Sequence, residues 1–365
     1  MSFDTRARIA RPLLRTNGGF LMADIVMADD GVRFEPESAT TGPLGGAESA
    51  FIALAEALAA RGHQVRVANR CAGARTVNGV AWTPIEQGVP ERADLYIANR
   101  GDKLVPLAPA ARRAAFWVHN PARYLMKWRY LSKLWGRRPV IVFLGSHHAS
   151  TYPRWAPDGG RAVIPYGVAA PFLTADRGAR IPGPRAIFTS NPLRSLDWLI
   201  DVWAGRIRPH ASAAELHVYA GPATYGAVGA AKSTPMESVL ARARATAGVV
   251  VHPPVAKAAL VEALGTARVQ LYRGDEGETF CSAVAEAQAA GVPGVVCDIA
   301  CMRERVTDGS TGFVVADGDA ASFTDRALTL LTDDGLWRRQ SQAARDAARP
   351  FTWDAAAARF EALIQ

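Results

Sequence analysis

The sequence predicts an α/β protein built of two consecutive domains, each a doubly wound parallel sheet with helices on both faces. Three observations support this prediction. The chain has 365 residues, which is enough for about two domains of ordinary size. Short apolar runs alternate with helical stretches along most of it, as in βαβ units. A stretch rich in proline and glycine, from Pro165 to Pro184, interrupts this alternation and predicts a linker.

The first domain is expected over residues 19–168, after a polar, basic tail at residues 1–18. Its predicted strands are Phe20–Met27, Gln64–Ala68, Val80–Ile85, Ala93–Ala98, Ala114–Val118, Val140–Leu144 and Arg161–Ile164. A helix is predicted over Ala47–Arg61, ending at Gly62. Gly45 and Gly46 stand just before this helix, where free backbone N–H groups can approach a phosphate or a sugar closely. A simple turn is the alternative for this glycine pair.

The second domain is expected over residues 169–349. Its predicted strands are Arg185–Thr189, Glu215–Ala220, Gly248–His252, Arg268–Tyr272, Val295–Cys297 and Gly312–Val315, and a helix is predicted over Leu196–Ile207. Residues 318–365 have a helical pattern, with a break at Pro350. We expect residues 350–365 to form a last helix that packs back toward the first domain. Two such domains form a cleft between their strand ends, where ligands usually bind.

The composition is that of a soluble globular protein, with 21% charged residues. The formal charge of +8 indicates an anionic partner, which could be nucleic acid, a membrane surface or the phosphates of a substrate. The four cysteines fit neither a disulfide framework nor paired zinc ligands, so we interpret them as reduced thiols. No apolar run reaches the ~20 residues of a membrane-spanning helix, and the N-terminus lacks an apolar leader segment. A cytoplasmic protein is expected.

The most informative stretch runs from Glu278 to Pro293. It follows a predicted strand and a glycine-bearing loop, and it opens a helix that stops at Gly291. Free N–H groups and the positive end of the helix dipole make this helix start suitable for an anion. Glu278 would stand at the mouth of the site and Glu286 more than a turn inside. One ligand with polar groups at both ends and an anion between them, such as a sugar nucleotide, suits this arrangement; a surface helix with two solvated glutamates is the alternative.

Two more residues follow predicted strands. Arg194 comes after Arg185–Thr189, in a loop that also contains Ser190 and Asn191, and its guanidinium could clamp a diphosphate. His119 ends a strand of the first domain and is expected to face the cleft. An exposed loop arginine and a structural histidine are the corresponding alternatives.

The segment 121–138 contains six cations and no acidic residue, interleaved with tyrosine and tryptophan. As one helix, it would place Tyr124, Trp128, Leu131 and Trp135 on one face and most cations on the other. This pattern suits the interface of an anionic membrane. A packed helix with a solvated basic face is the alternative, and a groove for single-stranded nucleic acid ranks last.

Taken together, these motifs resemble the GT-B glycosyltransferases of glycosyltransferase family 4, over roughly residues 20–360. The strongest element is a Glu-x7-Glu motif with its alanine-, glycine- and proline-bearing tail, here Glu278 to Pro293. Supporting elements are Gly45-Gly46-Ala47-Glu48, His119 at its strand end, Ile164 to Val168, and Glu304 to Gly312. The resemblance implies two Rossmann-like domains around a central cleft, with the first domain binding the acceptor and the second the donor.

The resemblance also implies a reaction and its residues. The expected activity is retaining, metal-independent transfer of a sugar from a nucleoside diphosphate to a glycan or lipid-linked acceptor of the cell envelope, as in polysaccharide biosynthesis. Glu286 would bind the donor ribose and Glu278 the donor sugar, and Arg194 would neutralise the diphosphate. The amides of Thr279, Phe280 and Cys281 would contact sugar or phosphate, as would the loop of Ser190 and Asn191. Gly45 and Gly46 would lie against the phosphates, and His119 would contact the transferred sugar.

The chain departs from the family pattern at three positions. Thr279 and Ser195 stand where glycine is usual, and Arg194 stands alone where the family commonly has an Arg and Lys pair. A sugar-nucleotide epimerase or hydrolase on the same fold is one alternative. A degenerate GT-B protein that binds a glycan without turnover is the other. A peripheral location on the inner face of the cell membrane would follow if segment 121–138 binds lipid.

Overall fold

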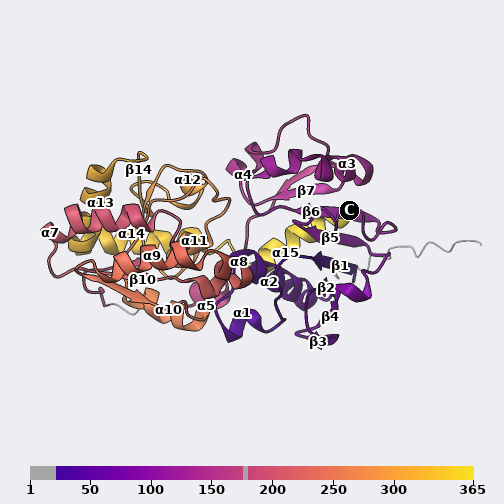
Figure 1. Ribbon diagram of the computed structural model, residues 1–365, viewed down its shortest axis with the longest axis horizontal. Helices are drawn as coiled ribbons and strands as arrows, with labels where there is room; N and C mark the ends of the chain where they lie inside the picture. The colour runs from indigo at the N-terminus through magenta and orange to yellow at the C-terminus, as the bar shows by residue number, and fades with distance from the viewer. Residues whose placement is uncertain (1–21, 176–179) are drawn as a thin grey trace, which may run out of the picture.

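A computed structural model describes residues 22–175 and 180–365. The predicted tail at residues 1–18 lies outside the described residues. The described chain forms two α/β lobes, with the N-terminal and C-terminal halves of the chain on opposite sides (Figure 1). The last helix, drawn in yellow, lies within the N-terminal lobe.

The first lobe contains an eight-stranded sheet of order β3-β4-β2-β1-β5-β6-β7-β8. Its strands are β1 (Asp24–Asp29), β2 (Gln64–Asn69), β3 (Arg75–Val77), β4 (Val80–Pro84), β5 (Leu95–Asn99), β6 (Arg113–Trp117), β7 (Val140–Phe143) and β8 (Arg161–Val163). All neighbours are parallel except β3 and β4, which form a hairpin through Asn78 and Gly79. Strand β3 is the strand missing from the sequence-based prediction.

The second lobe contains a six-stranded, wholly parallel sheet of order β11-β10-β9-β12-β13-β14. Its strands are β9 (Arg185–Phe188), β10 (Glu215–Tyr219), β11 (Val249–His252), β12 (Val269–Tyr272), β13 (Gly294–Cys297) and β14 (Gly312–Val315). Each matches a predicted strand to within a residue or two. Their residues are mostly buried, because a parallel sheet with helices on both faces exposes neither side to water.

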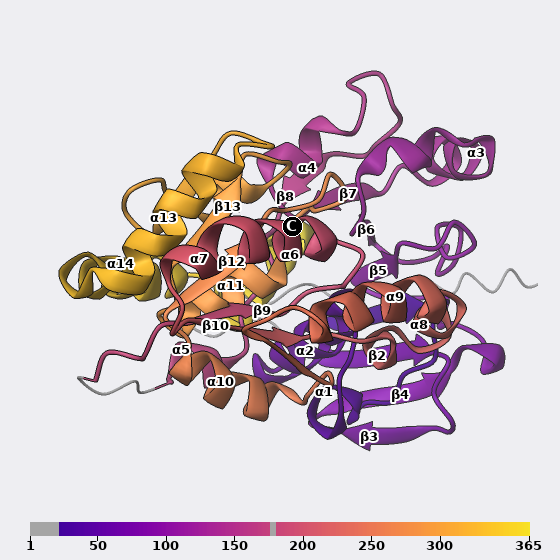
Figure 2. The ribbon, with the colours of Figure 1, turned by 60° about the vertical axis from the view of Figure 1, so that its left-hand side comes forward.

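Helices cover the faces of both sheets (Figures 1 and 2). The α-helices of the first lobe and the linker are α1 (Ser38–Thr41), α2 (Gly46–Ala60), α3 (Trp128–Arg137), α4 (Ser146–Ser150) and α5 (Ala170–Leu173). Those that follow are α6 (Leu196–Val202), α7 (Arg208–His210), α8 (Gly226–Ala231), α9 (Ser233–Arg244), α10 (Lys257–Thr266), α11 (Ser282–Ala289), α12 (Met302–Arg305), α13 (Ala320–Thr332), α14 (Asp334–Ala348) and α15 (Trp353–Glu361). The 3-10 segments are η1 (Ile85–Gln87), η2 (Ala122–Met126), η4 (Pro222–Tyr225) and η5 (Ala362–Ile364), and η3 (Trp203–Ile207) is a π-helical turn after α6.

Helix α15 crosses from the second lobe to pack on α2 of the first. Arg61, which follows α2, bonds Glu361 at 2.7 Å and Asp354 at 2.7 Å. Phe360 is fully buried and meets the ring of Trp117 edge-on, with the centroids 5.3 Å apart. One hydrophobic cluster therefore runs from the first sheet through α2 to α15, and it includes Phe280 of the second lobe. This shared core holds the two lobes together.

The basic aromatic segment is not the single helix that its pattern predicts. Residues Ala122–Met126 form η2, the backbone is extended at Lys127, and α3 starts at Trp128. Tyr130, Leu131 and Leu134 are buried, so Leu131 does not share an exposed face with the tryptophans. Trp128 and Trp135 are 72% and 47% exposed.

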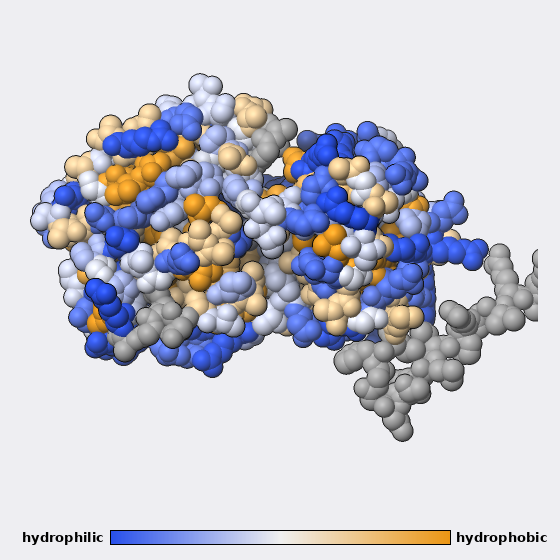
Figure 3. Space-filling view, turned by 90° about the horizontal axis from the view of Figure 1, so that it is seen from below, coloured by the Kyte–Doolittle hydropathy of each residue, from blue (hydrophilic) through white to orange (hydrophobic). Residues whose placement is uncertain are grey.

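The face of the molecule shown in Figure 3 is mainly hydrophilic, with small hydrophobic patches on both lobes. Among the described residues, no helix is both long and apolar enough to cross a membrane.

Candidate functional site

A cavity with a volume of about 250 Å³ lies between the two lobes. In each lobe, the strand order reverses next to this cavity. The reversal lies between β1 and β5 in the first sheet and between β9 and β12 in the second. In open α/β sheets this point, at the carboxyl ends of the strands, is where ligands bind. The cavity is lined from the first lobe by residues that include Gly46, Arg100, His119 and Tyr166, and from the second by Ser190, Arg194, Lys257, Glu286 and Glu278 to Ser282.

Two helix starts meet at this cavity. Gly46 is the first residue of α2 and Ser282 is the first of α11, and a Cβ on Gly46 would lie 3.6 Å from the Ser282 hydroxyl. Each helix start carries N–H groups without an intrahelical partner and the positive end of a helix dipole. Cys281 precedes α11 in the left-handed conformation, with φ of +58°. The two facing helix starts therefore form a place for an anion.

Glu278 lies beside this place and is almost fully buried. Its Oε1 accepts a hydrogen bond of 2.5 Å from Arg194 and another of 2.5 Å from the hydroxyl of Tyr272. Burial raises the pKa of Tyr272 well above its ordinary value, and the nearby thiol and carboxylate add to this effect, so Tyr272 stays a donor. Burial acts to lower the pKa of Arg194, but the nearby Glu278, Tyr272 and Cys281 together outweigh it and the pKa is raised. The two hydrogen bonds hold the carboxylate of Glu278 in one orientation.

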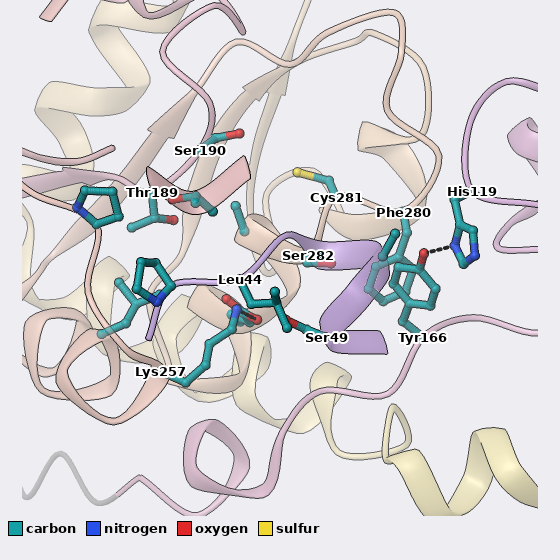
Figure 4. A pocket seen from close by; sticks show the side chains of 18 of the residues that line it. Leu44, Ser49, His119, Tyr166, Thr189, Ser190, Lys257, Phe280, Cys281 and Ser282 are labelled. Atoms are coloured by element: carbon teal, nitrogen blue, oxygen red, sulfur yellow. Dashed lines mark hydrogen bonds and ion pairs between the residues drawn. The ribbon is translucent and has the colours of Figure 1, made fainter. Parts of the chain in front are cut away.

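Glu286 has a cationic partner of its own. Lys257, the first residue of α10, places its Nζ 2.5 Å from Glu286 Oε1. The close-up in Figure 4 shows Lys257 on the side of the cavity away from His119. Each of the two glutamates that line the cavity is thus paired with a cation of the second lobe, Glu278 with Arg194 and Glu286 with Lys257.

His119 is buried at the other side of the cavity, and both of its ring nitrogens have partners. Asn99 donates from its amide nitrogen to Asp29 Oδ2 at 2.5 Å, so the amide oxygen of Asn99 faces Nε2 of His119. Because that oxygen can only accept, Nε2 of His119 carries the proton. Nδ1 then accepts from the hydroxyl of Tyr166, the contact drawn in Figure 4. Burial, with a smaller effect of Arg100, lowers the pKa of His119 well below its ordinary value. The imidazole is therefore neutral.

This hydrogen-bonded chain ends at Asp29, which shares the cation Arg100 with Glu48. Arg100 follows β5 in the left-handed conformation, with φ of +53°, and lines the cavity. Its Nη2 lies 2.6 Å from Glu48 Oε1 and 3.4 Å from Asp29 Oδ2. Burial raises the pKa of Asp29, and the charge of Arg100 opposes this.

The two residues that replace family glycines each have a specific structural role. Ser195 adopts the left-handed conformation that glycine favours, with φ of +60°, and its hydroxyl donates to the carbonyl of Gly274 at 3.1 Å. Thr279 donates from its hydroxyl to the backbone carbonyl of His119 at 2.6 Å, across the two lobes. Both side chains are therefore accommodated at the site.

Most of the residues predicted from the sequence are brought together at this cavity. Those that line it are Glu278, His119, Arg194, Glu286, Gly46, Thr279, Phe280, Cys281 and Ser190. Gly45 stands one residue outside it as the N-cap of α2. Asn191 does not line it either, since its side chain accepts from the amide of Leu193 and shapes its own loop.

Sequence reasoning missed Lys257, Arg100 and Tyr166. Lys257 comes five residues after β11 and Arg100 directly after β5. The rule that led to Arg194, a cation just beyond a strand of a parallel sheet, would have identified both. Lys257 adds a second cation of the same domain to the cavity that Arg194 lines.

The cysteines of the described chain are all free and buried. Burial raises the pKa of the Cys281 thiol well above its ordinary value, so it is protonated beside the cavity. In residues 22–175 and 180–365, no group of three or more histidine, cysteine or acidic side chains is arranged to hold a metal ion.

Residues 184–333 match the family model described as Glycosyl transferases group 1. The chain is 38% identical over 110 residues to a D-inositol 3-phosphate glycosyltransferase of Xylanimonas cellulosilytica, which is 30% of this chain and 26% of the relative. It is 37% identical over 81 residues to a phosphatidyl-myo-inositol mannosyltransferase of Mycobacterium leprae, which is 22% of each chain. The match thus spans about a quarter of the length of these relatives.

Solved structures with the same fold cover nearly the whole chain. Sucrose-phosphate synthase from Thermosynechococcus elongatus superposes with a TM-score of 0.68 and 16% identity, over 92% of this chain and 96% of that one. Alr3699/HepE of Anabaena, solved in complex with UDP-glucose, superposes with a TM-score of 0.65 and 14% identity, over 93% and 98%.

The two parallel-sheet domains that face each other across the cavity have the GT-B fold. The resemblance inferred from the sequence is confirmed by the family model, which covers the second domain from β9 to α13.

Proposed function

We propose that this protein is a retaining, metal-independent glycosyltransferase that moves a sugar from a nucleoside diphosphate to a glycan or lipid-linked acceptor of the cell envelope. The observation that supports this most is the arrangement of Glu278, Arg194 and Glu286 around the facing starts of α2 and α11. A donor has a ribose, a diphosphate and a sugar in this order, and the cavity offers a carboxylate, an anion site and a second carboxylate.

In this proposal Glu286 accepts from the ribose hydroxyls and Glu278 from the hydroxyls of the transferred sugar. The diphosphate lies between the two helix starts, where Arg194 and the backbone amides of Gly46 and Cys281 stabilise its charge. Stabilisation grows as the bond from the sugar to the phosphate breaks and negative charge collects on the leaving group. The N–H groups are already in place, so little reorganisation is needed at that moment.

His119 is proposed to contact the transferred sugar from the first lobe. It is neutral, and both of its nitrogens are bonded to protein groups, so it does not act as the base that activates the acceptor. We propose instead that the leaving phosphate takes the acceptor proton, and that the protein contributes position and charge.

A donor panel tests this function. The wild-type protein is screened by thermal shift against UDP, GDP, ADP and TDP sugars, and the donor that stabilises it is incubated with and without candidate lipid-linked glycan acceptors. We expect transfer that needs the acceptor, with the anomeric configuration of the donor kept in the product by NMR. Conversion of the donor alone would support an epimerase or a hydrolase, and stabilisation by no donor would support a protein that does not use sugar nucleotides.

The acceptor side is proposed to include an anionic membrane surface, contacted by segment 121–138. Trp128 and Trp135 are exposed and their rings are in edge-on contact, with the centroids 6.1 Å apart. The exposed cations around them include Lys127, Arg129 and Arg138. Asp102 pairs with Lys133 at 2.5 Å and lies 3.8 Å from Arg129. Exposed tryptophan beside exposed cations suits the headgroup region of an anionic bilayer. The protein would then act as a peripheral protein on the inner face of the cell membrane.

Sedimentation with vesicles tests this surface. Wild-type protein should pellet with phosphatidylglycerol vesicles and less so as salt rises, because the attraction is partly electrostatic. The variant Trp128→Ser/Trp135→Ser should stay in the supernatant, while a control at the exposed Trp155, Trp155→Ser, should pellet like the wild type. Equal pelleting of the wild type with neutral vesicles, or none with either kind, would remove the proposal.

A further inference from the structure

Lys257 is not part of any motif identified in the sequence, yet it contacts one of the two cavity glutamates. Its Nζ is 2.5 Å from Oε1 of Glu286, and within the described residues no other side chain bonds that carboxylate. Glu286 is 12% exposed and Lys257 31% exposed, so the contact is largely shielded from water and less screened than a surface ion pair.

The position of Lys257 in its helix is unfavourable by itself. It is the first residue of α10, and a cation in the first turn opposes the positive end of the helix dipole. The helix has no acidic residue in its first turn and no side-chain cap. A residue that breaks a local rule without local compensation usually serves a site. Here the compensating charge is Glu286, which lies 29 positions further along the chain.

A second contact fixes where the ammonium lies. Nζ is 5.7 Å from the ring centroid of Phe172, a fully buried residue of the linker helix α5. The Lys257 ammonium is therefore held between an aromatic face and a carboxylate. With Oε1 of Glu286 occupied in this way, Oε2 is the oxygen left for a ligand in the cavity.

We propose that Lys257 is a positioning residue, which holds Glu286 by one oxygen and so directs the other toward the ribose hydroxyls of the donor nucleotide. This inference rests on the proposed function. A carboxylate that rotates freely has little preference for one arrangement of hydroxyl groups. A carboxylate held by a charge-assisted hydrogen bond is already oriented to accept from the ribose hydroxyls. Lys257 thus determines how strictly the site distinguishes a ribonucleotide from a deoxyribonucleotide.

The test compares nucleotides that differ in the ribose alone. Calorimetry is run with UDP and 2′-deoxy-UDP, and with GDP and 2′-deoxy-GDP, on the wild type, Lys257→Met and Lys257→Gln. The wild type should prefer the ribonucleotide of one pair by roughly tenfold or more, the effect of a hydrogen bond to a charged group. In both variants the preference should fall below about threefold, because the carboxylate is no longer held. Lys257→Arg should restore part of it.

Two controls separate this role from a general loss of structure. Lys232→Met, at an exposed lysine of the same domain, should keep the wild-type ratio. Adding Lys257→Met to Glu286→Gln should change the ratio no further, because the two residues act as one unit. Variants that bind with the wild-type ratio would overturn the inference and leave the proposed function standing. A wild type with no preference in either pair would also overturn the inference, whereas a wild type that binds none of the donors of the panel would overturn the proposed function as well.

Discussion

The hydroxyl of Thr279, in the second domain, donates a hydrogen bond of 2.6 Å to the backbone carbonyl of His119, in the first. Thr279 stands where glycine is usual in the resembling family, and glycine cannot make this bond. Both residues line the cavity, so the contact joins the two walls of the candidate donor site. The substitution adds a link between the domains at the point where a sugar would lie.

Replacing Thr279 with valine should destabilise the protein. Valine keeps the shape but leaves the carbonyl of His119 without this donor in a buried place, at a cost of about 1–3 kcal/mol in free energy of unfolding. Chemical denaturation of the wild type and the variant measures this. Thr279→Ser keeps the hydroxyl and serves as the control, and equal losses in both variants would show that the hydrogen bond is not the cause.

Another contact between the domains, from His147 to Glu304, predicts an effect of substitution at Gly145. Glu304 Oε1 accepts from the backbone amide of His147 at 2.5 Å, and a Cβ on Gly145 would lie 2.0 Å from the other carboxylate oxygen. Gly145→Ala should therefore displace Glu304 and cost about 1 kcal/mol of stability. Gly136→Ala is the matched control, because nothing lies within 4 Å of a Cβ there. A Gly145→Ala variant as stable as the wild type would show that Glu304 does not depend on this space.

The buried His148 predicts a pH dependence of stability. Burial lowers its pKa to about 4, and it accepts from the amide of Leu144 while donating to the carbonyl of Asn120. Its folded pKa is below the unfolded value of about 6.5, so acid protonates the unfolded chain first. Stability should fall as the pH drops from about 6.5 toward 4, by up to about 1.4 kcal/mol per pH unit.

Unfolding at pH 7 and pH 5 measures this contribution. Between pH 7 and pH 5, the free energy of unfolding of His148→Gln should fall by about 2 kcal/mol less than that of the wild type, because the variant lacks this buried histidine. His210→Gln, at an exposed histidine, is the control. The same loss in His148→Gln as in the wild type would show that His148 does not carry this part of the pH dependence.

Tyr272 should matter for donor use more than for stability. Its hydroxyl donates to Glu278 at 2.5 Å, while its ring packs near Phe188, with the centroids 5.8 Å apart. Tyr272→Phe keeps the packing and removes one of the two hydrogen bonds that hold the Glu278 carboxylate, so kcat/KM for the donor should fall roughly tenfold. Tyr152→Phe removes another buried hydroxyl, which donates to Pro157 at 2.7 Å away from the cavity, and should leave kcat/KM unchanged. An unchanged kcat/KM in Tyr272→Phe would mean that Glu278 needs no such support.

Much of this structure follows from local pattern. The buried strands were predictable because runs of apolar residues, separated by turn residues, have few other interpretations. Strand β3 was not, since Arg75, Thr76 and Val77 form a short, polar run, although Asn78 and Gly79 after it are a hairpin signal. The break at Lys127 was also missed, because it depends on how Tyr130 and Leu134 pack in the core rather than on the helical pattern alone.

The site was predictable where residues follow strands within a motif, as Glu278, Glu286 and Arg194 do. Pairings between distant residues are decided by the tertiary fold and leave no local trace. The pair of Lys257 and Glu286, the bond from Thr279 to His119, and the chain from Tyr166 through His119 to Asp29 are all of this kind.

The central claim is that Glu278 binds the sugar and Arg194 the diphosphate of one sugar nucleotide. The most direct test is calorimetry with the donor selected by the panel, on the wild type, Glu278→Gln and Arg194→Met, with the exposed Glu262→Gln and Arg206→Met as controls. We predict that both site variants bind the donor at least about tenfold more weakly than the wild type, and that both controls bind like it. Wild-type affinity in Glu278→Gln and Arg194→Met would contradict the account.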